Sequence, residues 1–284
     1  MRHVLFALFL IPINVFGQGS DVPLGEIATK LKAEVQAFYK EPIRISLSDL
    51  DPYLGGTSDV ASDGTPTIRI SSALQSTARE VIIVHELHHL RLRALKFPAP
   101  IILPSETVAA LEELLPSINE NVISGLEHAI FFPEMKADGF DPIADNVDFY
   151  KKMLHTKTIP QYDDRWPIEA LGLIFFFFDV ELGSLGDSTE GAQVLQEYQR
   201  FIRAGGHYDA IAAIGNASAA AQLVRRETIK TPEQEAITII KVLNCLLSEF
   251  GTFSLFQVRP VERGEFQQQV ILVSLNPWAQ PQCQ

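Results

Sequence analysis

Three histidines and a carboxylate occupy five consecutive positions within "VIIVHELHHLRLRAL", residues 81–95. His85 and His89 are four residues apart, so on a helix they lie one turn apart on the same face. That spacing lets two imidazole nitrogens converge on one zinc ion. Glu86 would lie about 100° round the helix from His85, beside the ion rather than on it. This is the place of a general base that takes a proton from a zinc-bound water.

The alternative interpretation is the charged face of an amphipathic helix. Four apolar residues, Val81–Val84, lead directly into His85, which indicates that this part of the helix is buried. Burying several ionisable groups costs several kcal/mol unless they are paired or bound to a metal, so a metal site is favoured. We expect His88 to point to a neighbouring carboxylate or to solvent. The basic residues that follow suit a helix C-terminus without a further role: Arg91, Arg93 and Lys96.

The motif "HELHH" on a helix preceded by the strand "TPTIRIS" resembles the HExxH zinc metallopeptidases, the zincins. The resemblance covers residues 22–135. It implies Zn²⁺ as cofactor and a peptide or protein as substrate. It also implies a small sheet whose edge strand runs along the substrate, with the zinc helix packed behind it. We assign the strand at 66–71 to this role, in which main-chain hydrogen bonds would align an extended peptide.

The resemblance also bears on the third ligand, since a catalytic zinc takes three protein ligands and keeps one open position. The Gly-x-x-His of the metzincin type is absent after His89, whereas the gluzincin type draws a Glu from a following helix. The helix expected at 117–132 offers Glu127, which we predict to be the third ligand. His128 is the rival ligand. Small Ser124 and Gly125 would let this helix approach the zinc helix closely.

Other polar residues are weaker candidates for a role in the site. Asn121 and Glu120 could orient a ligating histidine as hydrogen-bond acceptors. His207 and Tyr208 follow Gly205-Gly206, and this loop could present an imidazole or a phenol to a developing oxyanion. A helix cap or an ordinary surface loop is the other interpretation of the pair.

Patterns of apolar residues and breakers predict an α+β fold that is predominantly helical. Strands are expected at 43–48 and 66–71 and, as a pair, within 252–260 and 268–275, while 49–65 carries turn signals. Helices are expected at 22–40, from Ser76 or Thr77 as cap to Pro98, from Ser105, at 117–132 up to Pro133, at 188–203, at 208–228 and from Thr231 to about Phe250. The run "IFFFF" is expected to pack in the core.

Composition and the N-terminus limit the other possibilities. The chain has 284 residues and a formal charge of −12 without a basic block, which argues against nucleic acid as a partner. Residues 1–19 are typical of a signal peptide, so we expect export to the periplasm or the extracellular space and no membrane span after cleavage; the alternative interpretation is an N-terminal anchor embedded in lipid. Residues 20–284 would form one domain, with a zincin-like core at 22–135 and a helical part at 140–284. The two cysteines, Cys245 and Cys283, could pair, or Cys245 could be buried with Cys283 free.

These observations favour an exported zinc-dependent hydrolase, most simply a peptidase. Two alternatives remain open. One is a zincin-like binding or regulatory protein that keeps the metal but cleaves nothing. The other is a helical partner-binding protein without metal, in which the histidines form a polar network.

Overall fold

The computed structural model describes residues 22–50, 54–97, 118–142, 189–204, 208–246, 255–259 and 269–273, and single positions between 147 and 182. The expected signal peptide, the helix expected from Ser105, His207 and Cys283 lie outside these ranges. The described chain is mostly helical with a small three-stranded sheet, which confirms the α+β class. None of the described helices is long and apolar enough to cross a membrane.

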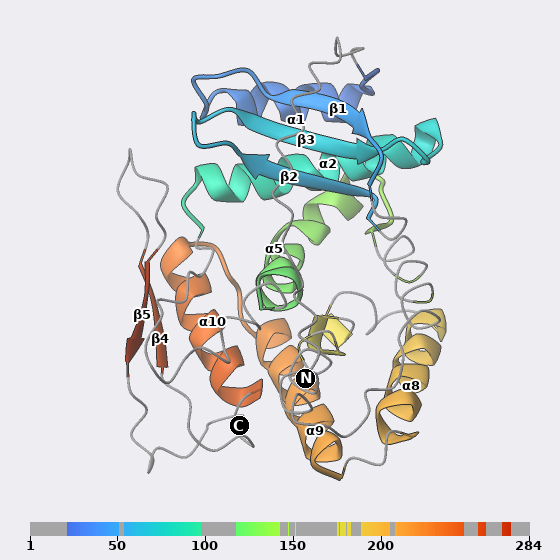
Figure 1. Cartoon of the computed structure of the whole chain (residues 1–284), viewed down its shortest axis with the longest axis vertical. Helices are drawn as coiled ribbons and strands as arrows, with labels where there is room; N and C mark the ends of the chain where they lie inside the picture. The colour runs from blue at the N-terminus through green and yellow to red at the C-terminus, as the bar shows by residue number, and fades with distance from the viewer. Residues whose placement is uncertain are drawn as a thin grey trace, which may run out of the picture.

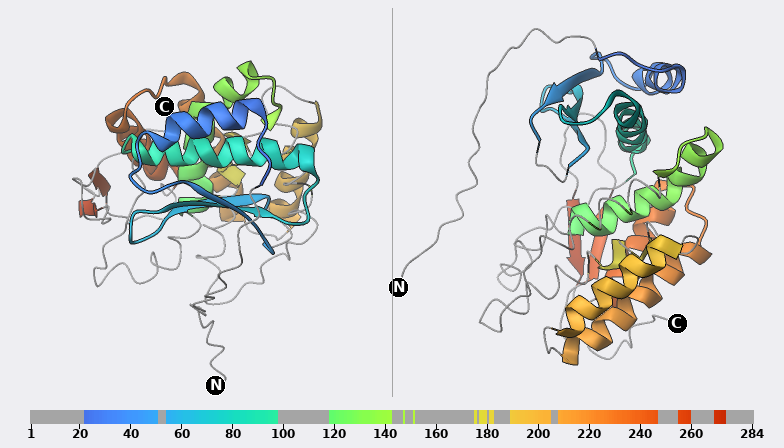
Figure 2. Two further views of the ribbon diagram at one scale, coloured as in Figure 1. Left: turned by 90° about the horizontal axis from the view of Figure 1, so that it is seen from above. Right: turned by 90° about the vertical axis from the view of Figure 1, so that its right-hand side faces the viewer.

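The N-terminal part combines a three-stranded sheet with two helices that cover one of its faces (Figure 1, Figure 2). Its elements are α1 (Glu26–Gln36), β1 (Arg44–Ser48), β2 (Gly56–Val60), β3 (Pro66–Ser71) and α2 (Ser76–Ala94). The strand order is β1-β3-β2, with β1 parallel and β2 antiparallel to β3. The helix α2 contains the HELHH motif, as predicted.

Apolar side chains from β3, α1 and α2 fill the space between the sheet and the helices. Ile68 and Ile70 are fully buried, because alternate residues of a strand point to the same face. Leu87 of α2 is fully buried as well, and each such side chain stabilises the fold by about 1.5–3 kcal/mol. The Tyr39 hydroxyl donates to the carbonyl of Leu90 at 2.8 Å and joins the end of α1 to α2.

The turn-rich segment 49–65 contains a strand, β2, that its sequence does not predict. Glycine at positions 55 and 56 disfavours a strand on propensity, yet a side chain there would collide with α2. A Cβ at Gly56 would lie 2.5 Å from Cγ2 of Ile82, and one at Gly55 would lie 2.9 Å from Cδ1 of Ile82. The two glycines therefore allow the close approach of α2, and pairing with β3 supplies the backbone hydrogen bonds.

The place of β3 in the sheet overturns its predicted role in substrate binding. Because β3 pairs with β1 on one side and with β2 on the other, its main-chain groups are not free for an added peptide. The assignment of residues 66–71 as the substrate-aligning strand is therefore wrong. Within the described sheet, the edge positions belong to β1 and β2.

The start of α2 differs from expectation. The helix begins at Ser76 itself, so Gln75 is the N-cap residue, and it makes no side-chain capping hydrogen bond. The prediction of a Ser76 or Thr77 cap is therefore wrong.

The basic residues near the end of α2 do more than suit a helix C-terminus. Arg91 is bonded to the Glu134 carboxylate and lies 3.8 Å from that of Glu34, so it contacts a residue on either side of α2. Arg93 donates to the Ser58 carbonyl of β2 at 2.7 Å. These contacts dock α2 against its neighbours.

The second helix of the site has an irregular start and a proline inside it. A π-helical segment, η1 (Ile118–Ile123), runs directly into α5 (Ser124–Ala137). Pro133 does not end α5, contrary to the prediction, because buried Phe132 and Met135 hold the chain on both sides of it while Pro133 itself faces solvent. The missing hydrogen bond of the proline is thus on the exposed side, where it costs least.

Gly125 contributes to a different contact from the predicted one. A Cβ at Gly125 would lie 2.9 Å from Oδ1 of Asp179 and 3.6 Å from Leu182. The small residue thus lets α5 approach the segment around 175–182, not α2. In this segment the side chains of Phe175, Phe177 and Phe178 are fully buried, which confirms the core role of the phenylalanine run.

Within the described residues, the C-terminal part has three long helices and a two-stranded antiparallel sheet. In the view of Figure 1, α8 and α9 lie below α5, and α10 and the sheet lie to its left. The elements are α8 (Thr189–Ala204), α9 (Tyr208–Arg226), α10 (Pro232–Leu246), β4 (Leu255–Arg259) and β5 (Gln269–Val273). All five confirm elements expected from the sequence. At the start of α10, the Gln234 N–H donates to Thr231 Oγ1 at 3.3 Å, and Gln234 Oε1 accepts from the Thr231 N–H at 3.2 Å. This is a complete capping box.

Candidate metal centre

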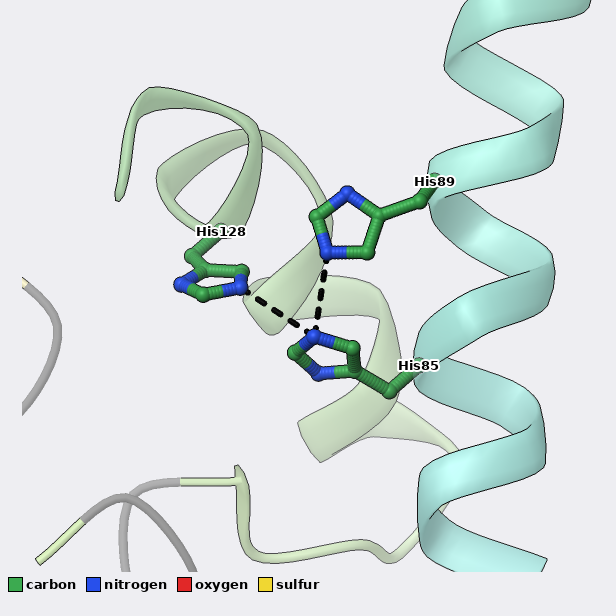
Figure 3. Close-up of side chains that lie close together, drawn as sticks. All are labelled: His85, His89 and His128. Atoms are coloured by element: carbon green, nitrogen blue, oxygen red, sulfur yellow. Dashed lines mark hydrogen bonds between the residues drawn. The ribbon is translucent and has the colours of Figure 1, made fainter. Parts of the chain in front are cut away.

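Three imidazoles from two helices meet at one point. His85 and His89 extend from α2, His128 extends from α5, and Figure 3 shows the three rings pointing toward one another. Nε2 of His85 lies 3.0 Å from Nε2 of His89 and 3.2 Å from Nε2 of His128. The three ligand atoms all lie within 4.8 Å of one another.

These separations suit a metal ion. Zinc–nitrogen bonds are about 2.0–2.1 Å long, so two nitrogens at tetrahedral positions on one zinc are roughly 3.3 Å apart. The two measured Nε2 separations are close to that value. The third separation, between the ligand atoms of His89 and His128, is within 4.8 Å, so these two rings would move closer together on binding an ion if they start beyond the tetrahedral value.

The contacts around His85 are also difficult to satisfy with hydrogen bonds alone. A neutral imidazole has one N–H and one lone pair, and Nε2 can be only one of these. Nε2 of His85 faces two other Nε2 atoms, so its single proton, or in the other tautomer its single lone pair, would have to serve both contacts. A cation at the centre accepts a lone pair from each nitrogen, which removes the conflict.

Burial keeps two of these imidazoles neutral. The pKa of His85 is held well below its usual range, first by burial and then by the nearby His128, His89 and His88. Burial, followed by the charge of His89, likewise holds the pKa of His128 well below its usual range. Both rings thus keep a lone pair at neutral pH, as metal ligation requires.

Glu127 contacts the His89 ring on the side opposite to the cluster. Its Oε2 atom is hydrogen-bonded to Nδ1 of His89, while Nε2 of His89 belongs to the cluster. Glu127 and His89 are both buried. A carboxylate that accepts from Nδ1–H fixes the tautomer in which Nε2 carries the lone pair.

The structure thus brings both predicted candidates for the third ligand to the site, in different positions. The imidazole of His128 lies in the cluster, whereas the carboxylate of Glu127 lies behind His89. The geometry favours His128, the rival in the sequence analysis, and gives Glu127 the orienting role that we expected of Asn121 or Glu120. Asn121 is buried, and the side chain of Glu120 is outside the described residues.

Phe131 supports all the imidazoles of the site. The phenyl ring is fully buried, with centroid distances of 5.2 Å to His85, 5.0 Å to His89 and 5.5 Å to His128, each in edge-to-face geometry. It also stacks on His88 at 5.0 Å. We did not identify this residue from the sequence. Its position three residues after His128 and four after Glu127, on the same helix face, could have indicated it.

His88 lies outside the cluster. It is 1% exposed, and its Nδ1 lies 3.9 Å from Oε2 of Glu134, so it faces a carboxylate as expected and does not face solvent. Burial, with Arg91 and His89 nearby, lowers the pKa of His88 to about 3. His88 therefore remains neutral and packs against Phe131 as part of the core.

Glu86 is a buried carboxylate next to His85 in the chain. It is 7% exposed, and among the described residues its side chain has no hydrogen-bond or ion-pair partner. Its predicted role as general base remains a prediction.

The other predicted residues lie at or beyond the limit of the described chain. Tyr208 begins α9, but its side chain is not among those described, and His207 lies outside the described residues. Their role as transition-state stabilisers therefore stays a prediction. Comparison of the chain with protein-family models, with curated proteins and with solved structures finds no match.

Proposed function

We propose that this protein is a zinc-dependent peptidase, with zinc held by Nε2 of His85, His89 and His128. The observation that carries the proposal is the convergence of the three nitrogens, at separations of 3.0 and 3.2 Å from that of His85. Three protein ligands leave the fourth position of a zinc ion open, which is typical of catalytic rather than structural sites. This arrangement is also what the resemblance to zincins implies, with a histidine in place of the expected glutamate.

In the proposed mechanism, each residue of the site would have a separate role. A bound zinc ion would act as a Lewis acid and lower the pKa of a coordinated water to about 7. Glu86, one residue from His85 and buried, would take the proton of the attacking water and deliver it to the leaving amine. Glu127 would hold His89 in the ligating tautomer, and Phe131 would keep the three rings in place.

The sheet supports a peptide as substrate. Since β3 is central, we assign the alignment of an extended peptide to β2, an edge strand of the described sheet that contacts α2. A peptide paired with β2 would gain main-chain hydrogen bonds that are independent of its sequence, and it would have to displace Arg93 from the Ser58 carbonyl. Export also belongs to this proposal: Cys245 is disulfide-bonded, and disulfides are typical of oxidising compartments.

Metal content and peptide cleavage of the purified mature protein would test the proposal. We expect about one zinc per chain in wild type and in Glu86→Gln, and little in His85→Ala. Glu86→Gln should lower the rate of peptide-library cleavage by about 10²–10⁴-fold, the usual contribution of a general base. Glu80→Gln, which removes a carboxylate earlier on α2, is the matched control and should retain both zinc and activity.

Each alternative has its own outcome in this experiment. Zinc in wild type without cleavage of any library peptide would favour the metal-binding or regulatory protein. No zinc after purification without chelators, and none restored by adding it, would leave the histidines as a polar network and contradict the proposal.

A further inference from the structure

Ser124 is a hydroxyl residue at the histidine cluster that the proposed mechanism does not use. Its Oγ lies 3.2 Å from Nε2 of His128, the atom that also lies 3.2 Å from Nε2 of His85. Ser124 and His128 are one turn apart on α5, so their side chains share a helix face. The hydroxyl therefore lies on the Nε2 side of the ring, toward the centre of the cluster.

The hydroxyl also lies where the cluster is least enclosed. His89 and His128 are buried, whereas His85 and Ser124 are only partly buried. The residues that follow Ser124 on α5, from Gly125 to His128, are all buried. A ligand that enters from solvent would therefore meet the cluster on the side of His85 and Ser124.

Metal binding would change the hydrogen bonding of this hydroxyl. The lone pair of Nε2 of His128 can either accept from the Ser124 hydroxyl or bind a cation, but not both. Once the lone pair is used, the hydroxyl proton needs another acceptor. The fourth tetrahedral position is roughly 3.3 Å from Nε2 of His128, and Ser124 Oγ lies 3.2 Å from the same atom, so an oxygen of a ligand near that position is a candidate acceptor for the hydroxyl.

We infer that Ser124 donates a hydrogen bond to an oxygen atom of the ligand that enters the open side of the cluster. This inference rests on the proposed metal site and extends it. A partly negative oxygen, such as that of a carboxylate, a hydroxamate or a polarised peptide carbonyl, is the acceptor that such a donor suits. A serine nucleophile is not favoured here, because Nδ1 of His128 is buried and no described residue accepts a hydrogen bond from it, as the carboxylate of a catalytic triad would.

The test uses the full mature protein loaded with Co²⁺, whose visible absorption reports both binding and coordination. Wild type, Ser124→Ala and Ser124→Thr are titrated first with Co²⁺ and then with acetohydroxamate. We expect equal Co²⁺ affinity in all three. Ser124→Ala should bind acetohydroxamate about tenfold to a hundredfold more weakly, the value of one hydrogen bond to a charged group, and Ser124→Thr should restore the affinity.

Other results would contradict the inference in distinguishable ways. Loss of Co²⁺ binding in Ser124→Ala, while circular dichroism matches wild type, would make Ser124 a metal ligand. Unchanged acetohydroxamate affinity in Ser124→Ala would show that the hydroxyl does not contact the ligand, and the proposed metal site would stand. No Co²⁺ binding by wild type would instead overturn the metal site, and the inference with it.

Discussion

Substitution of Glu127 and of His128, one at a time, would decide which of the two adjacent residues holds the metal. The geometry places Nε2 of His128 in the cluster and the Glu127 carboxylate on Nδ1 of His89. Both substitutions should weaken metal binding, but by different amounts and with different effects on coordination. We therefore predict that His128→Ala weakens zinc binding more than Glu127→Gln does.

The magnitudes follow from the two roles. Structural zinc binding of about 10–16 kcal/mol over four ligands gives about 2.5–4 kcal/mol for each, so removing His128 should cost roughly a hundredfold to a thousandfold in affinity. Glu127 contributes one charge-assisted hydrogen bond to His89, a ligand in the proposed site. Its loss typically costs about 10–100-fold, and the amide oxygen of a glutamine side chain at this position can still accept from Nδ1–H, so Glu127→Gln should fall near the lower limit.

Competition titrations with a chromogenic chelator would measure both affinities, and the Co²⁺ spectra would report coordination. Glu127→Gln should keep the spectrum of wild type, whereas His128→Ala should change it because one nitrogen ligand is lost. The control is Glu134→Gln, which removes a half-exposed carboxylate from the same helix and should leave zinc affinity within about twofold. The reasoning would be refuted if Glu127→Gln lost the metal while His128→Ala retained it. Glu127 would then be the third ligand, as the sequence predicts.

Three further predictions concern stability. Burial, followed by the charge of Glu127, raises the pKa of Glu235 well above its usual range, and neither carboxyl oxygen has a hydrogen-bond partner. A raised pKa stabilises the fold below the unfolded pKa of about 4.3, and this contribution is lost as pH rises. Glu235→Met should therefore flatten the fall of Tm toward pH 7 and raise the free energy of unfolding there by about 1–3 kcal/mol. An unchanged pH profile of Tm would contradict this. Thr231→Ala removes the side-chain cap of α10 and should lower the free energy of unfolding by about 1 kcal/mol in urea titrations. A loss below about 0.3 kcal/mol would show that the cap contributes little. Since Cys245 is disulfide-bonded and Cys283 is the other cysteine of the chain, Cys245→Ser should cost about 2–4 kcal/mol, and a thiol reductant should lower the Tm of wild type but not of this variant.

Local sequence signals were sufficient where local interactions decide the structure. The helix that carries His85 and His89 follows from an unbroken run that ends before Pro98, and α10 begins at the capping box that Thr231 and Gln234 predict. In β3, the alternation of Ile68 and Ile70 predicts both the strand and its buried face.

Tertiary contacts decided the elements that local signals did not predict. The strand β2 has poor strand propensity, and it forms because Gly55 and Gly56 admit Ile82 and because β3 provides a partner. With β2 undetected, β3 looked like an edge strand and received the substrate role. Likewise, Pro133 predicts the end of a helix, whereas buried neighbours on both sides of it keep α5 intact.

The identity of the third ligand illustrates a limit of periodicity. Glu127 and His128 are neighbours, about 100° apart round the helix, so their roles depend on how α5 is rotated relative to α2. The choice of Glu127 rests on the gluzincin pattern, in which a Glu from a following helix is the third ligand, and that helix is expected at 117–132 without an irregular segment. The structure has the π-helical segment η1 there, whose hydrogen bonds span one more residue per turn, and this shifts the phase of the residues before Ser124 relative to those after it. No residue in "INENVI" predicts that π-helical segment. The face of α5 that meets α2 is therefore set by packing, with Phe131 buried among the imidazoles. This rotation of α5 about its axis directs His128 into the cluster. Its neighbour Glu127 contacts only Nδ1 of His89, on the side away from the cluster.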